Sequence, residues 1–182
     1  MIIVLLGESA SGKSTIEKII SNKYNYEKTI SYTTRPIRSG EKNGVDYHYI
    51  SNDDFLAMAH TDKFAEVGLY NGWLYGTTKE QYLEDNIVCV LTPHGMRQIK
   101  RNLDSKNMRC FYIKTDRSKR LIKALERGDN VDEAIRRNQS DVGQYDGIED
   151  EVDFVIQNNY LSAEQLADTI VSICETEEEF LK

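Results

Sequence analysis

Short apolar runs alternate with amphipathic segments along most of the chain. Residues 2–6 form an uninterrupted apolar run rich in β-branched side chains, which predicts a strand buried on both faces. Further buried strands are predicted at residues 87–91, 110–113 and 154–156, and helical periodicity predicts helices at 14–21, 95–103, 118–127, 132–142 and from Ser162 onward. Ser162 and Gln165 have the spacing of a capping box at the start of that last helix. Strands that alternate with helices predict an α/β fold, with a mostly parallel sheet flanked by helices.

Residues 30–78 do not continue this alternation of strands and helices. Residues 45–50 alternate between apolar and polar side chains, which predicts a half-exposed strand. Asn71-Gly72 lies between two apolar segments, 65–70 and 73–75, and this arrangement indicates a β-hairpin. We therefore expect a small β-rich insert that projects from the core, where substrate specificity often resides.

Composition narrows the possible classes of protein. The 182 residues contain no linker-like tract, so we expect a single domain large enough to bury its own core. A net charge of −7 argues against general nucleic-acid binding, which needs a basic surface. The three cysteines lack metal-like spacing, and no apolar run is long enough to span a bilayer. The expectation is a cytoplasmic protein with reduced thiols and neither a nucleic-acid nor a membrane partner, whose oligomeric state the sequence leaves open.

A phosphate-binding loop follows the first predicted strand. Residues 7–14 match the pattern G-x-x-x-x-G-K-[ST] in full, and they open a predicted amphipathic helix. Backbone N–H groups of such a loop point at phosphate oxygens, Lys13 would neutralise the outer phosphates, and the Ser14 hydroxyl would bind Mg²⁺. The alternative is a glycine turn that binds nothing, which the flanking strand and helix disfavour. The candidate ATP-binding residues are Gly7, Glu8, Ser9, Ala10, Ser11, Gly12, Lys13, Ser14 and Thr15.

A second group of residues is suited to a phosphate on another molecule. Arg35 and Arg38 lie three residues apart in a segment with Pro36, and Tyr47 offers a phenol nearby in the sequence. Arginine forks donate two parallel hydrogen bonds to a phosphate. The alternative is a solvated surface loop with two ordinary arginines.

These residues carry a resemblance to the guanylate kinases. Residues 31–47, then Glu66, then Tyr75-Gly76-Thr77 are similar to the GMP-binding signature of that family in order and spacing. The resemblance implies that the GMP phosphate is held by Arg35, Arg38, Tyr47 and Tyr75, and that guanine is recognised by Ser31, Glu66 and Thr77. The chemistry agrees, because one carboxylate can accept both N1–H and the exocyclic amine of guanine. Adenine lacks this donor pair and would leave Glu66 unpaired, at a cost of about 1–3 kcal/mol.

The segment 117–141 resembles the helical lid of the same family. It carries Arg120, Arg127, Arg136 and Arg137, and arginines of such a lid move over the transferring phosphate. The alternative is a solvated helical face. The register does not separate Arg136 from Arg137, so the choice of Arg137 as the lid arginine is arbitrary. The candidate catalytic residues are Lys13, Arg35, Arg127 and Arg137, and Asn158 resembles a family residue near the adenine and ribose of ATP.

The chain departs from the family at the end of the strand predicted at 87–91. Typical guanylate kinases carry two aspartates there, one residue apart, where this sequence has Val90 and Thr92. The substitution removes the acidic group expected near Mg²⁺ and one polar neighbour of the acceptor. Ser14, nucleotide phosphates and water could still complete an octahedral site, since Mg²⁺ often keeps several waters.

The resemblance implies a kinase that transfers the γ-phosphoryl group of ATP to GMP, and to dGMP, with Mg²⁺ as cofactor, giving GDP and ADP. The expected division is a core of residues 1–30, 79–116 and 142–182, a GMP-binding insert of residues 31–78, and a lid of residues 117–141. Two alternatives remain. One is a kinase of this build acting on another phosphorylated ribose compound, and the other is a guanylate-kinase-like binding module without catalysis, which the intact Gly12-Lys13-Ser14 disfavours.

Overall fold

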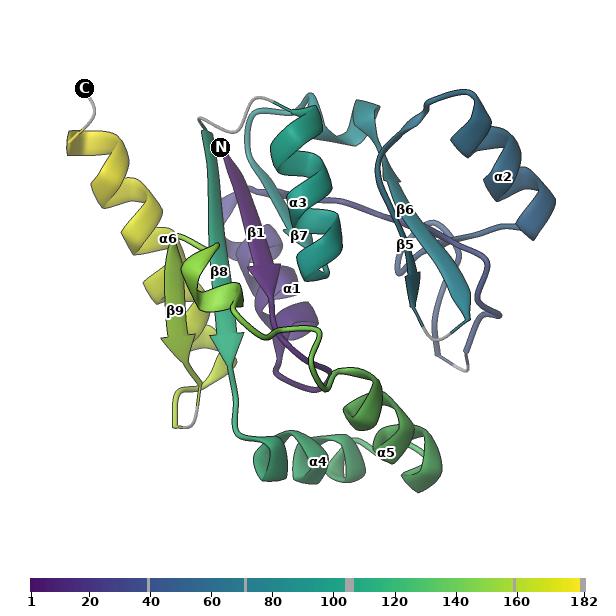
Figure 1. The fold of residues 1–182 in the computed structure, drawn as a ribbon. Coiled ribbons are helices and arrows are strands. Elements are labelled where there is room, and N and C mark those ends of the chain that lie inside the picture. Colours follow the sequence, from purple (N-terminus) through teal and green to yellow (C-terminus); the bar gives the residue numbers. More distant parts are fainter. Residues whose placement is uncertain (39, 71, 104–106, 159, 181–182) are drawn as a thin grey trace.

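A five-stranded parallel sheet forms the centre of the computed structural model, which describes residues 1–38, 40–70, 72–103, 107–158 and 160–180 (Figure 1). Its strand order is β2 (Glu27–Lys28), β7 (Ile87–Val90), β1 (Ile2–Leu6), β8 (Met108–Lys114) and β9 (Phe154–Gln157), and all neighbouring strands run parallel. The α/β fold with a mostly parallel sheet is confirmed, and the predicted buried strands correspond to β1, β7, β8 and β9.

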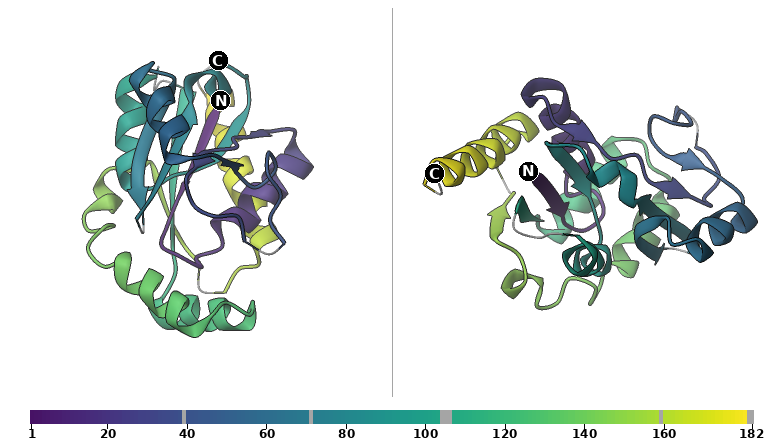
Figure 2. Two further views of the ribbon diagram at one scale, coloured as in Figure 1. Left: turned by 90° about the vertical axis from the view of Figure 1, so that its right-hand side faces the viewer. Right: turned by 90° about the horizontal axis from the view of Figure 1, so that it is seen from above.

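Helices cover both faces of this sheet, which explains why β1 is apolar at every position. Ile3 and Leu5 face a cluster that includes side chains of α1 (Lys13–Tyr24) and α6 (Ala163–Phe180). Val4 and Leu6 face a second cluster, which includes side chains of α3 (Pro93–Asn102) (Figure 2). A strand buried on both sides needs apolar residues throughout rather than in alternation.

The start of α6 has the predicted capping box. The Ser162 hydroxyl accepts the backbone N–H of Gln165 at 3.1 Å, and the Gln165 side chain accepts the N–H of Ser162 at 2.9 Å. Leu166 and Ile170 are buried on the face that this helix turns to the sheet. No helix in the described part of the chain is long and apolar enough to cross a membrane.

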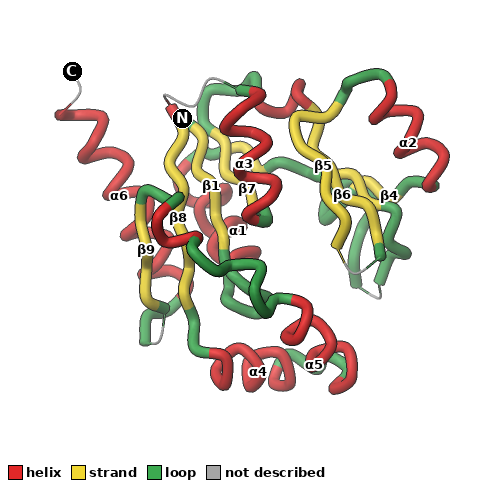
Figure 3. Tube along the Cα trace, viewed as in Figure 1, coloured by secondary structure: helices red, strands yellow, loops and turns green. Residues whose placement is uncertain are grey.

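A second, smaller sheet projects from one side of the core (Figure 3). Its order is β4 (His48–Tyr49), β3 (Tyr32–Thr33), β6 (Trp73–Thr78) and β5 (Phe64–Tyr70), and β5 and β6 form the predicted hairpin, with Tyr70 opposite Trp73. Asn71 of the turn lies outside the described residues, whereas Gly72 has φ 80°. Helix α2 (Asn52–His60), which the sequence analysis did not predict, packs on this sheet through the stacked rings of Phe55 and Phe64, with centroids 4.6 Å apart.

The strand predicted at residues 45–50 is wrong in most of its length. Only His48 and Tyr49 are extended in the sheet, because the preceding residues form a turn. The N–H groups of Val45 and Asp46 both donate to the carbonyl of Lys42, which holds the backbone away from a ladder. The alternation of side chains there reflects a turn with one half-buried tyrosine, Tyr47.

Helices α4 (Arg117–Glu126) and α5 (Val131–Ser140) lie beyond the ends of the central strands, below the sheet in Figure 1. The chain enters α4 from the end of β8 and returns through the short helix η3 (Ile148–Asp150) to β9. The connection between β1 and α1 lies at this same end of the sheet. Ligands of open α/β sheets usually bind at the carboxyl ends of the strands, so the fold places the candidate residues where a site is expected.

Candidate functional site

The loop between β1 and α1 has the backbone of an anion cradle. Ala10 and Gly12 adopt left-handed conformations, with φ 62° and φ 101°, so that the chain curls into the helix N-terminus. A side chain on Gly7 would place its Cβ 2.7 Å from Ser11 Oγ and 2.8 Å from the carbonyl of Ile113. A residue other than glycine at position 7 would therefore force the loop away from β8.

Lys13 folds back over this loop. Its ammonium donates to the carbonyl of Glu8 at 2.8 Å and to Ser11 Oγ at 3.3 Å. Desolvation lowers its pKa to about 8, although the nearby carboxylates of Asp141 and Glu8 act in the opposite direction. The ammonium is therefore held at the loop. Burial disfavours its charged form, and an anionic ligand bound there would stabilise that form.

Ser14 and Thr15 are exposed on the first turn of α1. A serine hydroxyl at this place is a suitable oxygen ligand for a hard cation. Within the described residues, no three His, Cys, Asp or Glu side chains gather closely enough to hold a metal ion. A cation here would therefore take most of its ligands from nucleotide phosphates and water, and the chemistry of the loop fits such a partly hydrated ion.

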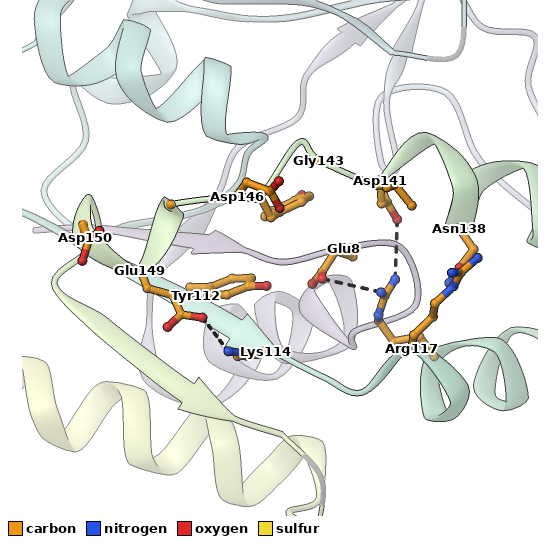
Figure 4. Close-up of a pocket in the computed structure, with 14 residues that line it drawn as sticks. Glu8, Tyr112, Lys114, Arg117, Asn138, Asp141, Gly143, Asp146, Glu149 and Asp150 are labelled. Atoms are coloured by element: carbon orange, nitrogen blue, oxygen red, sulfur yellow. Dashed lines mark hydrogen bonds and ion pairs between the residues drawn. The ribbon is translucent and has the colours of Figure 1, made fainter.

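A buried network of charges joins the loop to the segment that carries α4 and α5. Arg120 is 6% exposed, and its guanidinium lies 3.5 Å from a Glu8 oxygen and 3.7 Å from an Asp141 oxygen. Asp141 in turn accepts the backbone N–H of Ser9 at 2.7 Å. Glu8, Arg120 and Asp141 line a pocket of about 580 Å³. Figure 4 shows Glu8 and Asp141 of this pocket, with the Lys114–Glu149 pair on its other side.

Two tyrosines connect further elements to the loop. The Tyr70 hydroxyl, at the end of β5, lies 2.9 Å from Ser9 Oγ and 3.3 Å from an Asp141 oxygen. The Tyr145 hydroxyl donates to the carbonyl of Gly7 at 2.6 Å. The small sheet, the phosphate loop and the end of α5 therefore meet at Ser9.

The predicted phosphate-binding residues of the insert lie together. Arg35 is 6% exposed, and its guanidinium lies 5.4 Å from the ring centroid of Tyr47, whose ring is 5.8 Å from that of Tyr75. Arg35 is paired with Glu41 at 2.8 Å, and Arg38 lies 3.7 Å from Glu133 of α5. Arg38 is thus the member of the group that faces the helices beyond the sheet.

Glu41 is a further residue of this group, and the sequence analysis assigned it no role. Burial alone would raise its pKa, but hydrogen bonds from Arg35, from the Arg38 backbone and from Tyr49 hold the pKa at about 2. The carboxylate therefore stays charged and occupies the donors of Arg35. A phosphate that binds Arg35 has to compete with the Glu41 carboxylate or share the guanidinium with it.

The three residues predicted to recognise a base also lie together. Ser31 Oγ is 2.8 Å from Thr77 Oγ1, and Glu66 is paired with Thr77 in the register of β5 and β6. Burial raises the pKa of Glu66 to about 7, against the effect of hydrogen bonds from Thr77. A Cβ on Gly95, at the start of α3, would lie 3.2 Å from Glu66 Oε2, so glycine there leaves room around the carboxylate.

The two aspartates absent from this chain are replaced by residues with other contacts. Thr92 caps α3, since its hydroxyl accepts the N–H of Gly95 at 3.1 Å. Val90 packs, partly buried, on the apolar cluster that includes Ile16 and Ile20 of α1. Neither side chain supplies a negative charge at the end of β7.

The lid arginines differ in where they point. Arg127 is paired with Asp129, and Arg137 is paired with Glu133 at 2.7 Å. Arg127 and Arg137 line a narrow pocket together with Ser9 and Ala10 of the phosphate loop. Arg136 is paired with Glu133 as well, but 47% of its side chain is exposed, against 16% for Arg137.

Asn158 lies against the phosphate loop. Its amide donates to the carbonyl of Ser11 at 2.9 Å, and its side-chain oxygen is buried without a partner among the described residues. The residue therefore supports the loop directly, while its predicted contact with a nucleotide stays a prediction.

Sequence reasoning missed several residues that build this site. Arg120 was noted only as one charge among many, and Asp141, Tyr70 and Tyr145 were not singled out. Glu17 was also missed, although it is a carboxylate on a helix face that packs against the sheet and is 7% exposed. Burial raises the pKa of Glu17 to about 7. A charged residue inside the apolar stripe of α1 was the one local signal that could have identified it.

We expect Arg120→Met to lower the free energy of unfolding by about 3–5 kcal/mol, because it leaves the buried carboxylates of Glu8 and Asp141 without their cation. Urea unfolding followed by circular dichroism measures the change. Arg136→Met is the matched control, since its exposed pair with Glu133 contributes less than about 1 kcal/mol. Equal losses in the two variants would contradict the role assigned to the buried network.

Comparison with known proteins agrees with this geometry. The family model for guanylate kinase matches residues 1–173. The chain is 31% identical over 179 residues to the guanylate kinase of Fusobacterium nucleatum subsp. nucleatum, covering 94% of each chain. It is also 31% identical over 180 residues to the guanylate kinase of Bacillus subtilis, covering 95% of this chain and 87% of the other. The crystal structure of guanylate kinase from Anaplasma phagocytophilum shares the fold, with a TM-score of 0.72 at 24% identity over 97% of this chain and 85% of that one. This protein belongs to the guanylate kinase family.

Proposed function

We propose that the protein transfers the γ-phosphoryl group of ATP to GMP, and to dGMP, giving ADP and the diphosphate. The observation that carries this proposal is the grouping of Ser31, Glu66 and Thr77 in the same insert that holds Arg35 and Tyr47. A base and a phosphate of one nucleotide can be held by such a pair of groups. Family membership supports the same activity.

Guanine recognition follows from the chemistry of these three side chains. Ionised Glu66 accepts N1–H and the exocyclic amine, and the hydroxyls of Ser31 and Thr77 can donate to O6. The hydroxyls are 2.8 Å apart, so they can both approach one carbonyl oxygen. The phosphate of the acceptor would lie against Arg35, Arg38, Tyr47 and Tyr75.

Phosphoryl transfer needs no protein base, because the ionised phosphate of GMP is already a nucleophile. The protein contributes position and positive charge: Lys13 at the donor phosphates, Arg35 at the acceptor, and Arg127 and Arg137 over the transferred group. Ser14 would hold Mg²⁺, which when bound neutralises charge on the donor phosphates. Residues Gly7 to Thr15, together with Asn158, would bind ATP.

We further propose that residues 31–78 act as the acceptor-binding insert and residues 117–141 as a lid on a core formed by the remainder of the single domain. Arg127 and Arg137 are engaged with acids of the lid itself, Asp129 and Glu133, and a bound phosphate would draw them away from these partners. The three cysteines are buried free thiols, which suits the reducing cytoplasm as the location.

A coupled assay of ADP release with Mg-ATP tests the activity, with GMP, dGMP, AMP, CMP and UMP offered separately. We expect turnover with GMP and dGMP and little with the others. Lys13→Ala is the inactive control and should lower turnover by orders of magnitude, because the charge at the donor phosphates is lost. Turnover with a different acceptor would contradict the substrate assignment, and ATP binding without any turnover would favour a binding module.

Recognition of GMP should depend on the ionisation of Glu66. Since the pKa of Glu66 is raised to about 7, the carboxyl is protonated below that pH and can no longer accept both guanine donors. We expect kcat/KM for GMP to fall as the pH drops below about 7, reflecting the free enzyme. In Glu66→Gln this dependence should flatten, apart from the ionisation of the GMP phosphate near pH 6, and selectivity for GMP over AMP should fall by about 1–3 kcal/mol. A wild-type profile no steeper than that of the variant would refute the role of Glu66.

The two adjacent lid arginines should differ in their effect on catalysis. Arg137 faces the phosphate loop, whereas Arg136 faces solvent. We expect Arg137→Met to lower kcat by about 10²–10³-fold and Arg136→Met to leave it within about twofold. Steady-state kinetics at saturating ATP and GMP measures both. The reverse order of effects would assign the lid role to Arg136.

A further inference from the structure

We propose that Glu17 is a positioning residue for the divalent cation that accompanies the nucleotide, with its carboxylate accepting hydrogen bonds from water ligands of the cation beside Ser14. The inference rests on the proposed function only in requiring a metal-nucleotide complex at the phosphate loop. It assigns to α1 a charge that the end of β7 does not provide.

The first observation is that Glu17 is buried without a hydrogen bond or ion pair to another described residue. It is 7% exposed, and the charges of Lys28, Lys18 and Lys13 act on its carboxylate from longer range, lowering its pKa against the effect of burial. Placing an ionised carboxylate in such surroundings costs several kcal/mol unless something compensates it. Because these lysines offset the effect of burial only in part, a further positive charge from outside the chain would stabilise the carboxylate.

The second observation is the direction of the side chain. Glu17 follows Ser14 by three residues and Lys13 by four, so it lies on their face of α1. Side chains on a helix lean toward its N-terminus, which directs this carboxylate toward the phosphate loop. Its charge acts most strongly on Lys28 of β2 and on Lys18, then on Lys13, and it also acts on Cys89 of β7 and Tyr47. The carboxylate is therefore near enough to act electrostatically on the phosphate loop, on β2 and β7 and on Tyr47.

The third observation concerns the strand next to α1. In P-loop enzymes the metal is held by the loop Ser or Thr and by an acid from a neighbouring strand. Here Val90 ends β7 with its side chain in the cluster of Ile16 and Ile20, so it faces the helix that carries Glu17. The Glu17 carboxylate on α1 can thus approach the end of β7, where the strand itself has no acidic side chain.

The other carboxylates that act on Lys13 are already engaged. Glu8 and Asp141 share Arg120, and Asp141 also accepts the N–H of Ser9. Glu8 keeps one buried oxygen without a hydrogen-bond partner, but its other oxygen is paired with Arg120, whereas no ion pair of Glu17 is found among the described residues. A carboxylate behind a metal-bound ligand typically contributes about 10–100-fold to metal affinity.

The test measures ADP binding by calorimetry with and without Mg²⁺, in the absence of any acceptor. We expect Glu17→Gln to reduce the Mg²⁺-dependent gain in ADP affinity by about 10-fold or more, while ADP affinity in EDTA stays within about twofold of wild type. Glu175→Gln, an exposed change on α6, is the matched control and should behave as wild type. An unchanged Mg²⁺-dependent gain overturns the proposal, as does an equal loss of affinity in EDTA, which would indicate a structural role.

A second pair of variants tests the position of the charge. Glu17→Val should lose the Mg²⁺-dependent gain, and adding Val90→Asp to it should restore the gain, because the carboxylate then reaches the same region from β7. A folded double variant that shows no recovery would overturn the placement of Glu17 opposite Val90. Since ADP alone is used, failure here is distinct from failure of GMP phosphorylation, which the acceptor assay measures separately.

Discussion

The phosphate loop imposes one constraint on the whole molecule: its shape has to stay fixed while some of its backbone N–H groups remain available to an anion. Inside the loop, the N–H of Ser11 and the Lys13 ammonium donate to the carbonyl of Glu8, at 3.2 Å and 2.8 Å, and the loop also depends on contacts with other segments. It is held from outside, by the Asn158 amide on the carbonyl of Ser11 and the Tyr145 hydroxyl on the carbonyl of Gly7. Asp141 occupies the N–H of Ser9, and Arg120 neutralises Asp141. Preorganised polar groups of this kind are what phosphoryl transfer requires of a protein.

The same contacts connect the small sheet and the end of α5 to the phosphate loop. Tyr70 belongs to the hairpin of the small sheet, and Asp141 follows α5, yet both meet at Ser9. The insert and the lid are thus linked through the loop that would bind the donor nucleotide. A ligand that alters the surroundings of Ser9 would act on both at once, which gives a physical route from donor binding to closure over the acceptor.

The distribution of charge explains how an acidic protein can bind anionic nucleotides. The net charge of −7 is a property of the whole chain, whereas cations gather locally. Arg127 and Arg137 line a pocket with the phosphate loop, and Arg38 lies 3.7 Å from Glu133 of α5. Several of these cations are paired with acids of the protein: Arg35 with Glu41, Arg127 with Asp129 and Arg137 with Glu133. Such pairs keep the arginines in place and make phosphate binding an exchange of partners rather than the filling of an open positive site.

The sequence by itself determined the order of elements and most of the candidate site. The apolar run of β1, the periodicity of α1 and α6 and the Asn71-Gly72 turn are local signals, because burial on two faces, helical periodicity and turn chemistry each leave a short-range pattern. The phosphate-loop residues followed from the spacing of their motif, and the acceptor and lid residues followed from the resemblance to the guanylate kinases. Tertiary structure decided what depends on contacts between distant segments: that Arg120 meets Glu8, that Tyr70 meets Ser9, that Arg137 rather than Arg136 faces the loop, and that Glu17 lies unpaired beneath it. These partners are separated by tens of residues or face one another only after the sheet has formed, so no local pattern records them.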